Sequence, residues 1–421
     1  MRMAFSGGTL KGTVSSPPSK SHTHRAFFLS AMAKGDSKIT NCLISNDTLS
    51  TLKAAESIGA SVRRCCDGVL ISGGELHAPK EVVDAGNSGT TLRIFSGIAS
   101  MFDEWVTITG DDSMRKRPMG PLLDALGRMG VECRSDNGKP PVEIKGSNKG
   151  GKVAIDGGVS SQFITSLLMT SPMLANDVEI EILGKTVSEP YLDVTTHIMR
   201  LYGADVTKEK NIFRVKGGTG YSPHDYAVPA DFSSAAFPLV AGALGGEVTV
   251  KGLQMDDPQG DRVIIDILKD VGASVSVGKD RVTVKKEALE AKEIDIGKCP
   301  DLFPILAVLL STADGTSRLY GAPQLRFKES DRIKTTVNML KAIGADAEGT
   351  DDGCIIRGKK RLTGGVVNNE GDHRIMMASA VASLLCERSV VMDGAECCSV
   401  SYPEFPEHMR SLGMKNEEEM L

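Results

Sequence analysis

The sequence predicts an α/β protein with two domains, each made of three copies of one unit. Two observations lead to this prediction. Three different sequence patterns recur in phase along the 421 residues with a period of about 70 residues, and a stretch rich in proline and turn formers divides the chain near its middle. Each copy is predicted to run strand, helix, strand, helix, strand, strand.

The first pattern is an amphipathic helix that ends on a glycine, as in TLKAAESIGASV and IIDILKDVGASV. Glycine is expected here because the helix ends in a left-handed turn that other residues enter only at a cost. The six closing glycines lie 69–73 residues apart, at Gly59, Gly130, Gly203, Gly272, Gly344 and Gly413.

The second pattern is a polar residue, able to cap a helix, in front of a long apolar helix. The candidate caps are Ser21, Ser88, Ser160, Asp231, Asp301 and Asp372. The third pattern is a strand that ends on Gly110, Gly184, Gly252, Gly321 or Gly394, with Asn41 at the corresponding place in the first copy. Strand–helix–strand connections predict parallel pairing. Six units are too many for one core, so we expect two halves that divide at residues 221–229.

Composition and charge narrow the class of protein. The contents of 41% hydrophobic and 24% charged residues are typical of a soluble globular protein. The densest apolar run, residues 305–310, is far shorter than the ~20 residues that cross a bilayer, and the first residues do not form a secretory signal. Nine cysteines without CxxC or Cys/His spacing predict reduced thiols in the cytoplasm and no structural zinc. The net charge of −5 makes a nucleic-acid partner unexpected.

The capped helix starts carry the candidate chemistry. A helix start presents unpaired N–H groups and about half a positive charge, so equivalent starts are expected to converge on one anion-binding cleft. Their sequences fit anions: Lys20, Ser21 and Arg25; Asn87, Ser88, Gly89 and Thr90; Ser160, Ser161 and Gln162; Asp372, His373 and Arg374. Loops after the strand-ending glycines add Arg115, Lys116 and Arg117; Ser188 and Tyr191; and Arg326, Lys328, Glu329, Asp331 and Arg332. Each motif alone is more often an ordinary cap, turn or solvated charge run.

Other polar residues near these starts have simpler interpretations. His22 and His24 are two residues apart on a predicted helix and point to different faces, so they make a poor metal pair and are interpreted as structural or surface residues. Asp301 is expected to cap an apolar helix, which would place its carboxylate at the buried rim of the cleft. The segment with Asp231 and Ser233 carries no cation and is interpreted as structural.

Seven motifs together resemble the enolpyruvyl transferase family. In chain order they are PSKSxxxR, GNSGTxxR, RxRPM, SSQF, SxPYxD, KESDR and DHR, and the match spans residues 20–403. The resemblance implies two domains of three βαβαββ repeats with inward helices, an inverse α/β-barrel-like fold, with substrates bound between the domains. It also implies that the N-terminal strand returns to the second domain, which gives domains of residues 14–228 and of residues 1–13 with 229–421.

The resemblance further implies a reaction of the shikimate pathway of aromatic amino-acid biosynthesis. In it the enolpyruvyl group of phosphoenolpyruvate moves to the 5-hydroxyl of shikimate 3-phosphate, through a tetrahedral intermediate that releases phosphate, in a cytoplasmic monomer without a cofactor. The implied shikimate 3-phosphate contacts are Lys20, Ser21, Arg25, Ser160, Ser161, Gln162, Ser188, Asp301, Gln324 and Lys328. The implied phosphoenolpyruvate contacts are Lys20, Gly89, Arg117, Gln162, Arg332 and Arg374. The first domain would mainly bind shikimate 3-phosphate, and the second would hold phosphoenolpyruvate-binding arginines and acid–base residues.

Two positions depart from the family pattern. Gln324 stands where the family often has asparagine, and it still offers an amide. Val400 stands where the family often has a lysine that helps to bind phosphoenolpyruvate. Either Lys11, Arg115 or Lys116 substitutes for that lysine, or three arginines suffice.

The implied reaction needs an acid and a base. Glu329 and Lys20 are the candidates for the acid that protonates C3 of phosphoenolpyruvate, and Asp301 is the candidate base at the hydroxyl. The nearest alternative is the sister enzyme that uses UDP-N-acetylglucosamine, whose loop usually carries a reactive cysteine where this chain has DDSMRKRPM. A non-catalytic sensor of phosphorylated metabolites would lack the acid–base pair that is present here. The acidic tail, residues 416–421, is expected to be frayed.

Overall fold

A computed structural model describes residues 1–418 and divides the chain into two compact units. The N-terminal unit is Pro18–Val228, and the C-terminal unit combines Met1–Pro17 with the residues from Pro229 onward. Residues 14–17 therefore belong to the C-terminal unit, four residues beyond the expected boundary. The reason is that β2 (Leu10–Ser15) pairs along its whole length with β15 (Gly246–Lys251).

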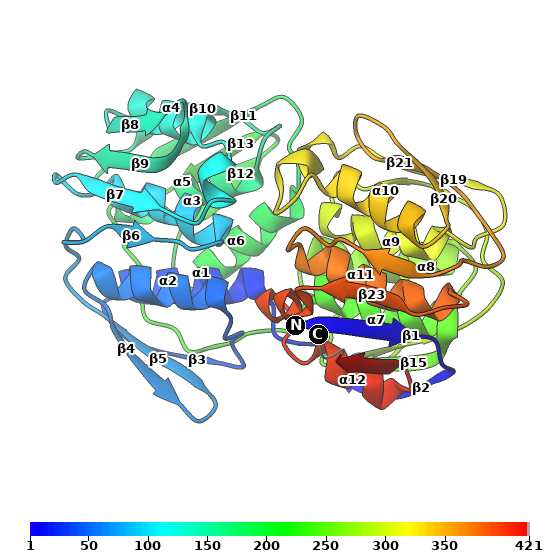
Figure 1. The fold of residues 1–421 in the computed structure, drawn as a ribbon. Coiled ribbons are helices and arrows are strands. Elements are labelled where there is room, and N and C mark those ends of the chain that lie inside the picture. Colours follow the sequence, from blue (N-terminus) through cyan, green and yellow to red (C-terminus); the bar gives the residue numbers. More distant parts are fainter. Residues whose placement is uncertain (419–421) are drawn as a thin grey trace. The chain divides into compact units, whose positions relative to one another are not determined.

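Each unit contains three repeats, and each repeat contributes one four-stranded sheet (Figure 1). The first repeat of the N-terminal unit has β14 (Tyr226–Ala227), α1 (Lys20–Met32), β3 (Gly35–Thr40), α2 (Asn46–Ser57), β4 (Ser61–Cys65) and β5 (Gly68–Gly73). The second has β6 (Val83–Asp84), α3 (Gly89–Ala99), β7 (Val106–Thr109), η1 (Met114–Lys116), α4 (Gly120–Arg128), β8 (Glu132–Asp136) and β9 (Lys139–Lys145). The third has β10 (Gly151–Asp156), α5 (Ser161–Thr170), η2 (Ser171–Met173), β11 (Val178–Leu183), α6 (Pro190–Leu201), β12 (Val206–Glu209) and β13 (Ile212–Val215).

The C-terminal unit repeats this order. Its first repeat has β2, α7 (Phe232–Gly245), β15, η3 (Gly260–Val263), α8 (Ile264–Asp270), β16 (Ser274–Val277) and β17 (Arg281–Lys285). Its second has β18 (Glu293–Asp295), η4 (Pro300–Leu302), α9 (Phe303–Leu310), β19 (Thr316–Tyr320), η5 (Pro323–Phe327), α10 (Arg332–Ala342), β20 (Asp346–Gly349) and β21 (Cys354–Arg357). Its third has β22 (Gly365–Val367), α11 (His373–Ala382), η6 (Ser383–Leu385), β23 (Val390–Asp393), η7 (Ala395–Val400), α12 (Phe405–Leu412), β24 (Lys415–Glu418) and, from the other end of the chain, β1 (Arg2–Ser6). The predicted βαβαββ repeat is confirmed.

The sheets share one strand order, as in β10-β11-β13-β12. The first two strands of a repeat are parallel, and in five of the six sheets the last two form a hairpin that adds antiparallel to the second strand. In the sixth sheet these two strands are β24 and β1, from opposite ends of the chain. The first repeat of each unit has exchanged its first strand with the other. Strand β2 precedes α1 in the chain but pairs beside α7, and β14 precedes α7 but pairs with β3 of the first repeat.

The chain consequently passes between the units twice, at Pro17–Pro18 and at Val228–Pro229. Two hydrogen bonds tie the crossing segments together within the C-terminal unit. Ser16 Oγ donates to the Asp231 carbonyl at 2.8 Å, and the Asp231 N–H donates to the Pro17 carbonyl at 2.8 Å. One of these two crossings, Val228–Pro229, lies within residues 221–229, where the break was expected.

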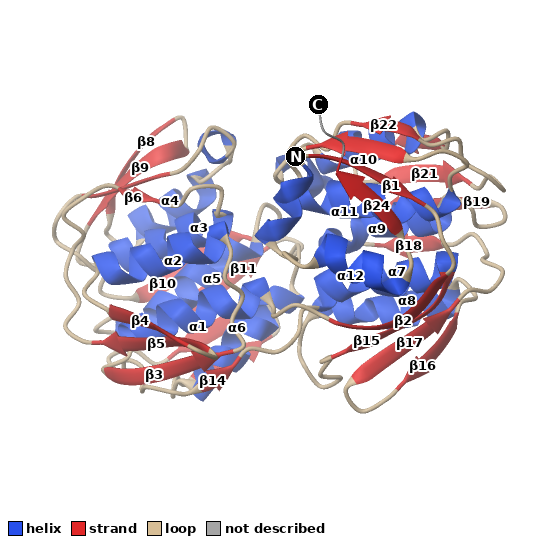
Figure 2. Ribbon diagram, turned by 60° about the horizontal axis from the view of Figure 1, so that its bottom comes forward, coloured by secondary structure: helices blue, strands red, loops and turns tan. Residues whose placement is uncertain are grey.

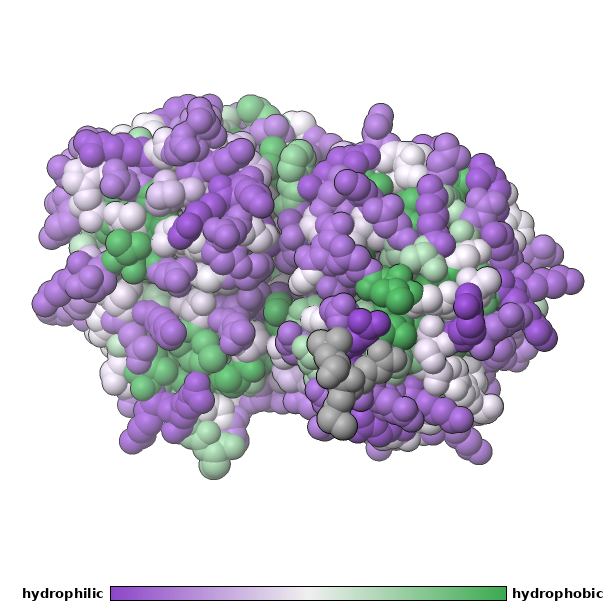
Figure 3. Space-filling view, in the orientation of Figure 1, coloured by the Kyte–Doolittle hydropathy of each residue, from purple (hydrophilic) through white to green (hydrophobic). Residues whose placement is uncertain are grey.

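Helices lie inside each unit and sheets outside (Figure 2). All eight residues of α9 are buried, as expected for a helix that is apolar on every side. The second helix of each repeat is amphipathic; α12 buries Phe405, Met409 and Leu412 on one face. Each unit has its own apolar core, and its visible surface is mostly hydrophilic (Figure 3). Within residues 1–418, no helix is both long and apolar enough to cross a membrane.

The expected helix ends are confirmed: the six closing glycines have φ between 87° and 111°, the left-handed region. The expectation of a frayed tail is wrong for residues 416–418. They belong to β24, which pairs antiparallel with β1 from Lys415↔Ser6 to Glu418↔Met3. Residues 419–421 lie outside the described part.

Candidate functional site

The inner helices of the N-terminal unit begin as the capping pattern predicted at two of three places. Ser88 Oγ accepts a hydrogen bond from the backbone N–H of Thr91 at 3.1 Å, at the start of α3. Ser160 Oγ accepts one from the backbone N–H of Gln162 at 3.3 Å, at the start of α5. Each cap satisfies one N–H group that the first helical turn leaves unpaired.

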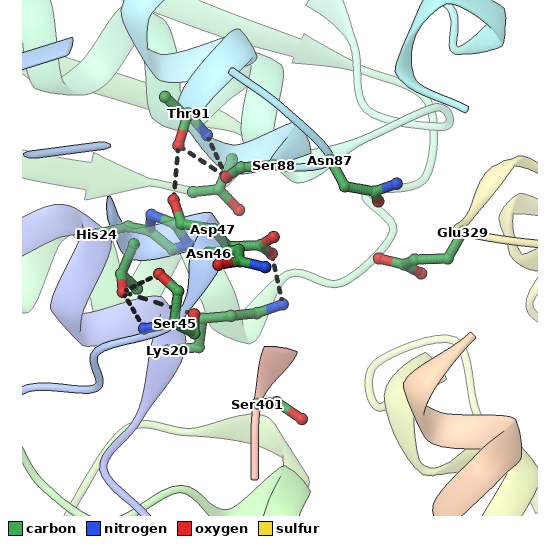
Figure 4. Close-up of polar contacts among 12 residues, drawn as sticks. Lys20, His24, Ser45, Asn46, Asp47, Asn87, Ser88, Thr91, Glu329 and Ser401 are labelled. Atoms are coloured by element: carbon green, nitrogen blue, oxygen red, sulfur yellow. Dashed lines mark hydrogen bonds and ion pairs between the residues drawn. The ribbon is translucent and has the colours of Figure 1, made fainter. Parts of the chain in front are cut away.

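Helix α1 differs from the prediction because Ser19, not Ser21, holds the N-cap position. The backbone of Ser19 is extended (φ −66°, ψ 118°), as a cap requires, and Ser21 lies inside the first turn. Lys20 begins the helix, and its Nζ is 3.0 Å from Asp47 Oδ2 in the first turn of α2 (Figure 4). Sequence reasoning missed this counter-ion, although Asp47 stands beside a capping serine, where acids favour a helix start.

Arg25 is 2% exposed and is bound by neutral oxygens. Its Nε donates to Thr195 Oγ1 at 2.8 Å, and its Nη1 donates to the Ser21 carbonyl at 2.9 Å. Its Nη2 donates to Thr165 Oγ1 at 3.4 Å and to the Tyr191 carbonyl at 3.3 Å. Burial lowers the pKa of the guanidinium to about 10, so it stays charged at neutral pH. A buried cation held by neutral dipoles favours an anionic ligand.

Gly89 is the first residue of α3, and two guanidinium groups approach it. A Cβ at this position would lie 3.1 Å from Arg117 Nη1 and 3.5 Å from Arg93 Nη1. Arg117 Nη2 also donates to Asn87 Oδ1 at 3.3 Å. Glycine therefore lets the Arg117 guanidinium lie against a helix start whose N–H groups already favour an anion.

Gln162 joins the starts of α3 and α5. Its Oε1 accepts a hydrogen bond from Arg93 Nη1 at 2.6 Å, and its Nε2 donates to Thr90 Oγ1 at 2.9 Å. Arg93 also lies over the Phe163 ring, 5.3 Å from its centroid. The two hydrogen bonds fix which way the Gln162 amide points. Arg93 was missed as a site residue, although it ends a predicted motif.

The predicted serines occupy the ends of elements around these helices. Ser188 is buried between β11 and α6 with φ 53°, a region that residues other than glycine enter only with strain. Ser161 is the buried first residue of α5. Strain of this kind gathers at functional sites, which agrees with the predicted role of Ser188.

The C-terminal unit gathers predicted cations around one carboxylate. Asp301 Oδ1 accepts from Arg332 Nη1 at 2.9 Å and lies 3.4 Å from Lys328 Nζ. Asp301 Oδ2 accepts from Arg374 Nη2 at 3.1 Å. Arg332 Nη2 also binds Glu329. Five predicted site residues thus form a single cluster.

Asp301 is not a helix cap, contrary to expectation. It lies in η4, and the following helix α9 has Leu302 at its N-cap position. The carboxylate binds Lys328, Arg332 and Arg374 instead, because hydrogen bonds from cations are stronger than a bond from a backbone N–H. The sequence could not show this, since these cations follow 27 to 73 residues later.

Arg332 is the centre of the cluster and is 1% exposed. Its Nε donates to Asp372 Oδ2 at 2.9 Å, and Ser330 Oγ donates to the same oxygen at 3.1 Å. Asp372 also caps α11, as predicted, by accepting from the Arg374 N–H at 3.0 Å. Burial opposes the charge of Arg332, but the charges of Asp372, Glu329 and Asp301 outweigh it and raise the guanidinium pKa above its ordinary value.

Gln324 is buried in η5, and both polar atoms of its amide lack a hydrogen-bond partner among the described residues. An unsatisfied buried amide costs free energy. A polar ligand would supply the missing partners, which agrees with the predicted role of Gln324.

Asp261 was missed by sequence reasoning. It lies in η3, is 3% exposed and binds the Ser233 hydroxyl. Burial and the charge of Asp301 raise the pKa of its carboxyl to about 7. The repeat contained a signal, because η3 follows the strand-ending Gly252 as the loop with Arg332 follows its own glycine.

The candidates to replace the absent lysine lie at different places. Val400 ends η7, and Lys11 is exposed on β2. Arg115 and Lys116 are exposed in η1, where Arg115 Nη1 lies 3.6 Å from Asp112 Oδ1.

Titratable side chains elsewhere do not form a metal site. Across residues 1–418, no group of three or more His, Cys, Asp or Glu side chains is arranged to hold an ion. His22 and His24 are both fully buried in α1, so the structural interpretation holds and the surface one is wrong.

Solved structures share this fold. Two chains of EPSP synthase from Acinetobacter baumannii match 99% and 100% of this chain and 100% of their own length, with a TM-score of 0.82 and identities of 29% and 28%. The shared fold therefore places this chain in a class of two-unit, six-repeat proteins that includes these EPSP synthases.

Sequence comparison narrows this class. The profile of the EPSP synthase (3-phosphoshikimate 1-carboxyvinyltransferase) family matches residues 6–409. Proteins named 3-phosphoshikimate 1-carboxyvinyltransferase from Methanocorpusculum labreanum and Methanocaldococcus jannaschii are 48% and 41% identical, over 100% and 97% of both chains. The chain belongs to the EPSP synthase family.

Proposed function

We propose that this chain transfers the enolpyruvyl group of phosphoenolpyruvate to the 5-hydroxyl of shikimate 3-phosphate, giving 5-enolpyruvylshikimate 3-phosphate and phosphate. The observation that carries the proposal is the cluster in which Arg332 binds both Asp301 and Glu329. The candidate base and the candidate acid are thus both bound to one cation, which supports acid–base chemistry between two anionic substrates.

Each unit supplies part of the binding set. Arg25, which neutral oxygens hold in place, binds the phosphate of shikimate 3-phosphate. The other proposed contacts to this substrate are Lys20, Ser21, Ser160, Ser161, Gln162 and Ser188 of the N-terminal unit and Asp301, Gln324 and Lys328 of the C-terminal unit. Phosphoenolpyruvate is held by Lys20, Gly89, Arg117 and Gln162 of the N-terminal unit and by Arg332 and Arg374 of the C-terminal unit. The N-terminal unit thus binds mainly the sugar-like substrate.

The chemistry follows from where protons must move. Glu329, or alternatively Lys20, gives a proton to C3 of phosphoenolpyruvate, and C2 becomes electrophilic. The 5-hydroxyl attacks C2 while Asp301 accepts its proton, which forms the tetrahedral adduct. The adduct loses phosphate, which carries away the proton held on Asp301. The acid takes back a proton from C3, and the double bond forms again.

The setting of the reaction is also part of the proposal. All nine cysteines are free, which agrees with reduced thiols in the cytoplasm. One chain carries every residue of the proposed set, so a monomer suffices. The partners are the two small substrates rather than nucleic acid or membrane, and no cofactor takes part.

The test is phosphate release followed with each substrate alone and with both. We expect release only with both substrates, with one enolpyruvylated product formed per phosphate. Release from phosphoenolpyruvate with UDP-N-acetylglucosamine, but not with shikimate 3-phosphate, would instead assign the chain to the sister activity.

A further inference from the structure

Helices α1 and α2 are joined by two polar contacts one helical turn apart. Lys20 Nζ lies 3.0 Å from Asp47 Oδ2, and His24 Nδ1 lies 2.6 Å from Thr51 Oγ1. Residues four apart share a helix face, so the two contacts belong to one interface. The first contact reaches the proposed substrate site, whereas His24 and Thr51 are both 0% exposed.

Helix α3 reaches both contacts through Thr91. Thr91 Oγ1 is 2.6 Å from Thr51 Oγ1 and 3.4 Å from the Asp47 carbonyl oxygen. It also lies 2.7 Å from Ser88 Oγ, the cap that precedes Gly89 (Figure 4). A displacement of Thr51 would therefore reach the Lys20 contact and the start of α3 together.

The imidazole of His24 is neutral. Burial lowers its pKa well below the ordinary value, and the charges of Lys20 and Arg25 lower it further. Its Nε2 is buried without a hydrogen-bond partner among residues 1–418. Buried N–H groups without a partner are rarer than buried acceptors without one, so the proton is on Nδ1. Nδ1–H therefore donates to Thr51 Oγ1.

This choice of tautomer orients the other hydrogen bonds. A hydroxyl has one hydrogen to donate. Thr51, having accepted from His24, donates to Thr91 Oγ1, and Thr91 donates to Ser88 Oγ. Ser88 Oγ also accepts from the Thr91 N–H at 3.1 Å. The chain of hydrogen bonds therefore runs one way, from α1 through α2 to the cap of α3.

Burying these polar side chains costs desolvation free energy, which apolar side chains of similar size would not cost. The hydrogen bonds that run from His24 through Thr51 and Thr91 to Ser88 nevertheless favour one arrangement of the three helices that they join. We propose that His24 is a positioning residue, which through Thr51 and Thr91 holds Lys20 and the Ser88–Gly89 turn in one arrangement. The proposal rests on the proposed function only in assigning Lys20 and Gly89 to the substrates.

The test compares variants of similar volume. Thr51→Val and His24→Leu each break the series of hydrogen bonds from His24 to Ser88, whereas His24→Asn keeps an N–H donor near the position of Nδ1. Ser30→Ala is the matched control, because Ser30 is also fully buried on α1 and bonds Tyr202 Oη at 2.8 Å. We expect Thr51→Val and His24→Leu to lower kcat about 10-fold, since small misplacements of a reacting group cost this much or more. The kcat of His24→Asn should stay within about 3-fold of the parent value, and the kcat of Ser30→Ala should equal the parent value.

Two further readouts separate positioning from loss of stability. The double variant His24→Leu/Thr51→Val should be no slower than Thr51→Val alone, because both break one chain. Acylation of Lys20, quantified on its peptide by mass spectrometry, should be several-fold faster in Thr51→Val than in Ser30→Ala. The acylation readout does not need turnover, so it tests the inference even if the proposed reaction fails. Parent kcat with parent Lys20 reactivity in Thr51→Val would overturn the proposal.

Discussion

Arg25 of the N-terminal unit and Arg332 of the C-terminal unit are equally buried but are held in opposite ways. The bonds of Arg25 go to hydroxyl and carbonyl oxygens, and burial lowers its pKa to about 10. The bonds of Arg332 go to the carboxylates Asp301, Glu329 and Asp372, which raise its pKa. The same repeat architecture therefore produces two different buried cations. Arg25 has no bond to a carboxylate among the described residues, whereas three carboxylates neutralise Arg332.

The difference matches two tasks. A substrate phosphate needs a strong anion site, and neutral dipoles leave the charge of Arg25 to the ligand. Proton transfer needs carboxylates held in place, and Arg332 binds and orients both Asp301 and Glu329. The N-terminal unit is suited to binding and the C-terminal unit to acid–base chemistry. Four predictions test this comparison, from the largest expected effect to the smallest.

The largest effect is expected from Glu329→Gln. The amide keeps the shape but removes the titrating group, so kcat should fall by about 10²–10⁴-fold. Binding of both substrates, measured by calorimetry, should change little, because the lost interaction exists mainly in the transition state. Glu179→Gln is the control, since Glu179 pairs with Arg214 at 3.1 Å outside both sets of site residues. If Glu329→Gln turns over near the parent rate, Glu329 is not the acid.

The second prediction compares the two arginines directly. Arg332→Met leaves three carboxylates without their shared cation and should lower the free energy of unfolding by about 3–5 kcal/mol. Arg25→Met removes a cation that burial destabilises, so it should change stability by less than about 1 kcal/mol or raise it. Urea unfolding without ligands measures both. Equal losses would mean that the two environments do not differ as described.

The third prediction concerns Asp261, whose pKa in the fold is about 7 against an ordinary value of 3.8. The folded state holds the proton more tightly, so this carboxyl increasingly destabilises the fold as pH rises from about 4 to about 7. Asp261→Asn should therefore gain roughly 2–4 kcal/mol of stability relative to the parent between pH 4 and pH 8. Denaturant unfolding across this range is the measurement. A difference that stays constant with pH would contradict the raised pKa.

The smallest effect is expected from Gly89→Ala. The added methyl would lie 3.1 Å from Arg117 Nη1, so the guanidinium must shift. The KM for phosphoenolpyruvate should rise about 5-fold or more, and that for shikimate 3-phosphate should rise less. Steady-state kinetics with each substrate varied in turn would show the split. Equal rises would indicate that the glycine serves folding of the turn instead.

The sequence by itself determined the repeated unit and which polar and charged residues are candidates for the site. Helix ends and hairpins are local, so glycine turns and apolar periodicity predicted six βαβαββ units. Motifs at helix starts predicted that Lys20, Gly89 and Gln162 would lie near one another, and hydrogen bonds now link their helices. The motif KESDR named both Glu329 and Arg332 as site candidates, and Arg332 Nη2 binds Glu329 in the structure.

The tertiary structure decided which side chains and which strands pair with one another. Arg25 and Thr195 are 170 residues apart, and the exchange of β2 and β14 between units leaves no local trace. Asp301 became the centre of three cations rather than a cap, and Asp261 acquired its raised pKa, only through packing. Charge and burial depend on side chains brought together from distant repeats, whereas a local pattern specifies only the helix or strand that carries each residue.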